Sequence, residues 1–316
     1  MLSSAACDCL SSIGASIFEL LPFQKRVYCL TNLLHLTKSQ SNLIRSASAR
    51  ALGVYVTFTS LKEDQTFLND LSCSLITLLT NDTNNLVRQK TAWSLSNLSE
   101  VLVENGDKLG RTFTDEFNLT IWLRLLDTAS NLCIRESDKL KSYLVRTLGN
   151  LINYVTLIDV ELIKKEFKLD ILLTSITKAI EALCSCKNVK MLKVKWNLSH
   201  AIGVAMRQFN TWPLQINNPK WLSIFYDTLL ELFTMSNNFK VRINACIALM
   251  NINLNRTDGN TFQNPKESIY FKLWVSLLDT FTKTNNENIS LLDATNEAQH
   301  KTTLLHQVIK YYFRVP

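Results

Sequence analysis

One arrangement of apolar, basic and small residues recurs along the chain. An aliphatic residue precedes Arg or Lys, a residue that is usually small follows four positions after the basic residue, and an aliphatic residue follows at seven. These positions fall on one face of a helix with 3.6 residues per turn, so each copy predicts an amphipathic helix, here named helix B. The basic residues of the five copies lie 43 to 54 positions apart and are Arg45, Arg88, Lys141, Lys195 and Arg242.

Four of the five copies also carry a small residue eight positions after the basic residue. These residues are Gly53, Ser96, Gly149 and Gly203. Gly inside a helix costs about 1 kcal/mol relative to Ala, so its return at one register needs a packing reason. We expect a neighbouring helix to pack closely against each of these positions.

A second amphipathic segment, helix A, precedes the copies at 67–80, 116–132, 169–183 and 219–234. A helix A, a short loop and a helix B at this spacing are typical of HEAT and armadillo arrays. We therefore expect an all-α fold, an α-solenoid of stacked helical hairpins with about six repeats, forming a single domain over 1–316. The expected repeats are 1–20 (partial), 23–60, 66–104, 115–158, 168–210, 219–256 and 266–313.

The composition agrees with long helices joined by short links. The 316 residues include only 7 Gly and 5 Pro, and 47% of them are hydrophobic. The eight cysteines form no CxxC pair and several sit in apolar runs, which indicates buried thiols in a reducing compartment. We therefore expect an intracellular protein, cytoplasmic or nuclear. No apolar run approaches the roughly 20 residues that would span a membrane.

No motif for catalysis or cofactor binding is present. The chain lacks GxGxxG, GxxxxGK[ST], HExxH and GxSxG, and its four histidines have no metal-ligand spacing. We expect no catalytic residue, no cofactor and no metal. Among the histidines, His200 is flanked by the apolar face of a helix B, so we expect it to be packed or to lie at an interface.

The basic series allows two interpretations. Because its members stand at equivalent places, they should line up along the stack. They could form a structural ladder, each cation bonding a carboxylate or carbonyl of its own or the next repeat, or a basic track that binds acidic peptide or phosphate. HEAT arrays favour the ladder.

A second basic feature is a stretch without Asp or Glu at 182–226, within a chain of net charge +7. Its candidate partner-binding residues are Lys187, Lys190, Lys193 and Arg207. Trp196, Trp212 and Trp221 interleave with the cations, and cations with aromatic residues can bind nucleic acid. The ordinary interpretation is a solvated loop with tryptophans buried in the core. An acidic segment of another protein is the partner that we favour over nucleic acid.

Several segments resemble the C-terminal half of the HEAT repeat-containing protein 6 family: SASARALGVYV, LVRQKTAWSLSNL, VRTLGNLINYV, KVKWNLSHAIGVAMRQF, NFKVRINACIAL and WPLQINNPKWL. The resemblance implies a large solenoid of which this chain would be the C-terminal portion. It also implies no catalytic residues.

The expected function is a non-enzymatic scaffold or adaptor for other proteins. A karyopherin-like transport adaptor is one alternative, but Trp93 with Asn97 and Trp196 with Asn197 do not share the register that such proteins need to grip peptides. A nucleic-acid-binding solenoid with a basic groove is the other. The sequence leaves the partner's identity and the oligomeric state open.

Overall fold

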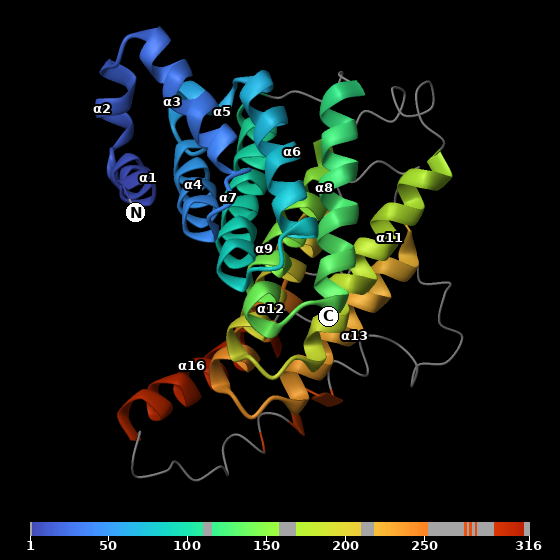
Figure 1. Ribbon diagram of the computed structural model, residues 1–316. Coiled ribbons are helices and arrows are strands. Elements are labelled where there is room, and N and C mark those ends of the chain that lie inside the picture. The colour runs from blue at the N-terminus through green and yellow to red at the C-terminus, as the bar shows by residue number, and fades with distance from the viewer. Residues whose placement is uncertain are drawn as a thin grey trace. The chain divides into compact units, whose positions relative to one another are not determined.

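The computed structural model describes residues 2–109, 116–157, 169–209, 218–251, 275–276, 278–279, 282 and 294–312. Within these ranges every regular element is helical, which confirms the predicted all-α fold (Figure 1). The chain divides into two compact units, Met1–Leu183 and Cys184–Pro316. Each unit is a stack of helical hairpins. The single domain expected over 1–316 would join the two stacks in one array, and this stays a prediction.

The helices of the first unit alternate between the two roles that the sequence predicts. They are α1 (Leu2–Ser12), α2 (Ala15–Leu20), α3 (Phe23–Leu36), α4 (Asn42–Tyr55), α5 (Thr59–Lys62), α6 (Gln65–Asn81), α7 (Asn85–Leu109), α8 (Glu116–Arg135), α9 (Asp138–Asn153), the 3-10 helix η1 (Tyr154–Leu157) and α11 (Leu169–Ser185), whose last residues belong to the second unit.

Three hairpins, α3 with α4, α6 with α7 and α8 with α9, build this unit (Figure 1). Their B-helices form one layer, in which α1, α4, α7 and α9 pack side by side in that order. The A-helices α3, α6 and α8 form the second layer. Buried Ala49, Leu78 and Val87 join a B-helix, the next A-helix and the next B-helix in one apolar cluster. Stacking therefore buries apolar faces that no single hairpin could cover.

Side-chain caps determine where the two helices of the second hairpin begin. The carboxylate of Asp64 accepts the amide of Phe67 at 3.0 Å and begins α6. The side chain of Asn84 accepts the amides of Leu86 and Val87 at 3.0 and 3.2 Å and begins α7. Asp64 therefore marks where the hairpin begins, and Asn84 lies in the short link where the chain turns from α6 into α7.

The second unit contains the 3-10 helix η2 (Cys186–Asn188), α12 (Leu192–Gln208), α13 (Pro219–Met235), α14 (Phe239–Leu249) and α16 (Ala294–Tyr312). The B-helices α12 and α14 pack side by side, and α13 packs against both. Pro219 stands in the first turn of α13, where a missing N–H costs nothing, and the Asn218 side chain accepts the amide of Lys220 at 3.0 Å. Buried Trp221 anchors this helix in the core.

The predicted A-helices match α6, α8, α11 and α13 within three residues at either end. In the expected last repeat, 266–313, only α16 and a few isolated positions fall within the described residues.

Candidate inter-repeat contacts and interaction surface

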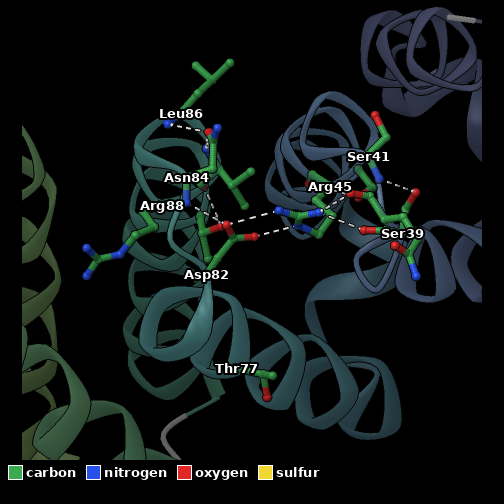
Figure 2. A network of polar contacts seen from close by, with 12 residues as sticks. Ser39, Ser41, Arg45, Thr77, Asp82, Asn84, Leu86 and Arg88 are labelled. Carbon is green, nitrogen blue, oxygen red and sulfur yellow. Dashed lines mark hydrogen bonds and ion pairs between the residues drawn. The ribbon is translucent and has the colours of Figure 1, made fainter.

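Arg45, the basic residue of the first copy, bonds to the next hairpin (Figure 2). Its Nε and Nη2 donate to the two carboxylate oxygens of Asp82 at 2.6 and 3.2 Å, and its Nη1 donates to the carbonyls of Ser39 and Gln40 at 2.8 and 2.9 Å. Asp82 directly follows α6, and its side chain is only 4% exposed. A bidentate pair of this kind fixes both orientation and distance between the two hairpins.

The carboxylate of Asp82 is held in its charged form. Burial alone would raise its pKa, but the hydrogen bonds from Arg45 and from the amide of Asn84, together with the charges of Arg45 and Arg88, lower the pKa below its ordinary value. The hydrogen bond with Asp82 raises the pKa of Arg45 in turn. The pair is therefore an ion pair at neutral pH.

The next copy repeats this arrangement. Arg88 donates from Nε to the carbonyl of Leu79 at 3.3 Å and pairs through Nη2 with Glu136, which directly follows α8. Both side chains are largely buried. Arg45 and Arg88 thus each tie the start of one B-helix to the end of the following A-helix, which is the contact that a ladder requires.

The other three members of the series differ. Within the described residues neither Lys141 nor Lys195 forms an ion pair, and both are half-buried. Arg242 is 5% exposed, and its guanidinium lies 5.6 Å from the ring centre of Phe239. A ladder through all five positions stays a prediction.

The small residues at the eighth position lie where B-helices approach one another. A Cβ placed on Gly53 would lie 2.2 Å from Oγ and 2.8 Å from Cα of Ser94 on α7. A Cβ on Gly203 would lie 2.9 Å from Cβ and 3.1 Å from Cα of Ala248 on α14. Ser96 and Gly149 are buried in α7 and α9.

A series of asparagines one position further along was not recognised from the sequence. The amide of Asn97 donates to the carbonyl of Gly53 at 3.0 Å, and that of Asn251 donates to the carbonyl of Gly203 at 3.1 Å. Asn150 donates to Oγ of Ser99 at 3.0 Å and, at 3.5 Å, to the carbonyl of Ser96. Each asparagine therefore bonds to the preceding B-helix. The signal was present, because three of the five copies end in Asn.

The expected basic strip divides into two parts. Lys187 lies in η2 and pairs with Glu231 of α13, so its charge is already neutralised, contrary to its expected availability for a partner. Lys190, Lys193 and Arg207 are exposed. The stretch 182–226 could not reveal this pair, because Glu231 lies outside it, 44 positions after Lys187.

The tryptophans of this stretch differ in how far they are buried. Trp221 is buried in the core as expected, and Trp212 lies outside the described residues. Trp196 is 48% exposed although a core position was expected. His200, expected to be packed or to lie at an interface, is exposed. Both stand on the face of α12 that points away from its buried residues, which include Val194, Leu198 and Ile202.

Two cations on the B-helices of the first unit pair with carboxylates of the preceding B-helix. Arg50 of α4 lies 3.8 Å from the carboxylate of Asp8 on α1, and Arg146 of α9 pairs with Glu100 on α7. In both pairs the cation stands five positions after the basic residue of its copy. The equivalent place on α12 is His200.

The remaining candidate chemistry concerns thiols and metals. None of the eight cysteines, all of which lie in described parts of the chain, forms a disulfide bond, and burial raises the pKa of Cys184 and of Cys246 to about 12. Among the described residues no three His, Cys, Asp or Glu side chains gather as a metal site. In the same residues no helix is both long and apolar enough to cross a membrane.

Comparison with solved structures places the fold among armadillo and HEAT proteins. The designed armadillo repeat protein in complex with the peptide (KR)4 matches with a TM-score of 0.54 and 14% identity over 88% of this chain and 99% of its own. Importin-β from the Kap95p–RanGDP structure matches with a TM-score of 0.54 and 14% identity, over 99% of this chain and 41% of its own. The Kap95:Nup1 complex matches with a TM-score of 0.55 and 14% identity, over 99% of this chain and 40% of its own.

Sequence comparison adds a longer relative. An uncharacterized protein of Dictyostelium discoideum is 30% identical over 149 residues, which is 47% of this chain and 10% of that protein. This chain therefore aligns with about a tenth of the length of that relative. No protein family profile matches the chain. The chain is an α-solenoid of the armadillo and HEAT type.

Proposed function

We propose that the chain is a non-enzymatic adaptor that binds other proteins on the exposed faces of its B-helices. One observation carries the proposal. Successive B-helices pack side by side at equal register, so side chains at the same place in each copy form a continuous surface within each unit. Such a surface can follow an extended segment of a partner over several repeats.

The related folds support this proposal. The matched structures include a designed armadillo protein with a peptide, and Kap95p with RanGDP or Nup1. We carry over only the use of the solenoid as a protein-binding surface. The resemblance to the HEAT repeat-containing protein 6 family and the cytoplasmic or nuclear localisation belong to the same proposal.

A karyopherin-like use of Trp–Asn pairs has less support. The amide of Asn97 is bonded to Gly53 and is nearly buried, so a peptide could not reach it without breaking an inter-repeat contact. We therefore favour a scaffold that binds through exposed side chains at other positions.

Site-specific photo-crosslinking in cells tests the proposal. A photoreactive amino acid would replace Arg50 on α4 or His200 on α12, and, as matched controls, Thr77 on α6 or Thr174 on α11. All four positions are exposed. We expect protein adducts from the B-helix positions and few from the A-helix positions. Adducts confined to the A-helix positions, or none at all, would contradict the proposal.

A further inference from the structure

Two neighbouring B-helices of the second unit carry cations and no carboxylate. The segments of α12 and α14 contain no Asp or Glu. Lys193 and Arg207 on α12 and Lys240 on α14 are exposed. Because α12 and α14 pack side by side, the charges of Arg207 and Lys240 add to one positive surface.

The first unit shows how the same fold neutralises such charges. There a B-helix cation pairs with a carboxylate of the preceding B-helix, as in Arg50 with Asp8 and Arg146 with Glu100. In the second unit the carboxylate of Glu231 pairs with Lys187, which stands outside α12. Neither α12 nor α14 therefore offers a carboxylate of its own to the exposed Arg207.

The exposed residues of α12 form one face. Lys193, Trp196, His200 and Arg207 follow at intervals of three, four and seven, which places them along a single stripe of the helix. The stripe covers 14 residue steps, or about 21 Å at 1.5 Å per residue. An extended peptide of about six residues has that length. With Lys190, which is exposed just before the helix, these residues are named the α12 face.

The half-exposed indole of Trp196 gives the α12 face an apolar element between its charges. An exposed tryptophan beside cations can pack on an apolar side chain while the cations bind the carboxylates that flank it. Base stacking in single-stranded nucleic acid uses several aromatic side chains in succession. Trp221 is buried, so among the described residues of 182–226 Trp196 alone is an exposed tryptophan. This favours protein over nucleic acid.

We propose that the α12 face is a docking site for an acidic segment of a partner protein that carries an apolar side chain among its carboxylates. The proposal rests on the function proposed above and specifies its partner. Carboxylates of the partner bind the exposed cations Lys190 and Arg207, and its apolar side chain packs on Trp196. Charges of this kind raise the association rate and make binding salt-dependent.

Fluorescence anisotropy with the full chain tests this proposal. The probe is the fluorescein-labelled peptide Glu-Glu-Leu-Glu-Glu-Phe-Glu-Glu, with its Gln-for-Glu counterpart and a twelve-nucleotide oligothymidine as comparisons. We expect the acidic peptide to bind at low salt, to weaken as salt rises, and to bind more tightly than either comparison. Tighter binding of the oligothymidine would overturn the proposal in favour of nucleic acid.

Charge-reversal variants locate the site. Lys190→Glu with Arg207→Glu should raise Kd for the acidic peptide about tenfold, which corresponds to about 1.4 kcal/mol. The matched control, Lys25→Glu with Lys38→Glu, changes the net charge equally at exposed sites of the first unit and should change Kd less than about twofold. Trp196→Ala should also weaken binding, and Trp196→Phe should restore most of it. Equal losses in variant and control would mean a non-specific charge effect and would overturn the proposal.

Acetylation of the unmodified protein gives a readout that does not depend on folding of the variants. Bound peptide should slow acetylation of Lys190 and leave that of Lys25 unchanged. Equal rates at both lysines would overturn the proposed site. If the acidic peptide fails to bind while the photo-crosslinks at Arg50 persist, the α12 face is wrong but the adaptor function stands.

Discussion

The guanidinium of Arg45 and the carboxylate of Asp82 form a two-point ion pair between successive hairpins, at 2.6 and 3.2 Å. Arg45 lies in the first turn of α4, a helix B, and Asp82 directly follows α6, the helix A of the next hairpin. Arg88 and Glu136 make the same connection one repeat later. The repeat pattern of the sequence thus has a physical counterpart in contacts that run from each hairpin to the next.

Loss of the Arg45–Asp82 pair should make the protein less sensitive to acid. The lowered pKa of Asp82 means that its charge stabilises the fold above the unfolded-state pKa of about 3.9 and that this contribution is lost as pH falls through the folded-state pKa. Asp82→Asn should reduce stability at pH 7 by about 1.5–3 kcal/mol. Urea unfolding at pH 7 and below pH 4 measures both effects. Equal differences between variant and wild type at the two pH values would contradict this account.

Glycine substitutions should differ in cost according to the space beside them. In a helix interior Ala is about 1 kcal/mol more stabilising than Gly, whereas forcing an extra group into a packed core costs about 1–3 kcal/mol of stability. Gly53→Ala should be the most destabilising, because its Cβ meets the backbone of Ser94 at 2.8 Å. Gly203→Ala should cost less, and Gly14→Ala, whose Cβ would lie 4.0 Å from Oγ of Ser16, should change stability little. Thermal melts give the order, and a Gly53→Ala protein as stable as wild type would refute close packing.

Asn97 should contribute more to the stability of the fold than an asparagine that bonds within its own helix. The amide of Thr57 donates to the carbonyl of Val54, so the carbonyl of Gly53 depends on Asn97 at the end of α4. Asn97→Ala should therefore cost about 1–3 kcal/mol. Asn244 donates to the carbonyl of Lys240 on its own helix, and Asn244→Ala is the matched control. Equal losses of stability in the two variants, measured by urea unfolding, would argue against the inter-repeat role.

The cysteines should separate into reactive and inert groups. Burial raises the pKa of Cys184 and Cys246 to about 12, so little thiolate forms near neutral pH. Cys9 is exposed. Iodoacetamide at pH 8 should modify Cys9 in the folded protein and reach Cys184 and Cys246 only after unfolding, as read by mass spectrometry. Rapid modification of Cys184 or Cys246 in the folded state would contradict their burial.

The sequence predicted the helices and their pairing because the repeat imposes one register on apolar, basic and small residues. It could not predict which carboxylate meets Arg45 or Lys187, since Asp82 and Glu231 stand 37 and 44 positions away. Trp196 was placed wrongly because an aromatic residue in an amphipathic helix usually belongs to the core. Which face of α12 stays uncovered depends on neighbours that helical periodicity alone does not specify.

Hydrogen exchange of Gly53→Ala compared with wild type tests the central claim most directly. If hairpins contact only their neighbours, the damage should stay local. The account predicts faster amide exchange in α4, α6 and α7 and unchanged exchange in α12 and α14. A uniform acceleration over all five helices would show that the chain unfolds as one cooperative body, and would contradict a stack of hairpins held together by contacts between neighbours.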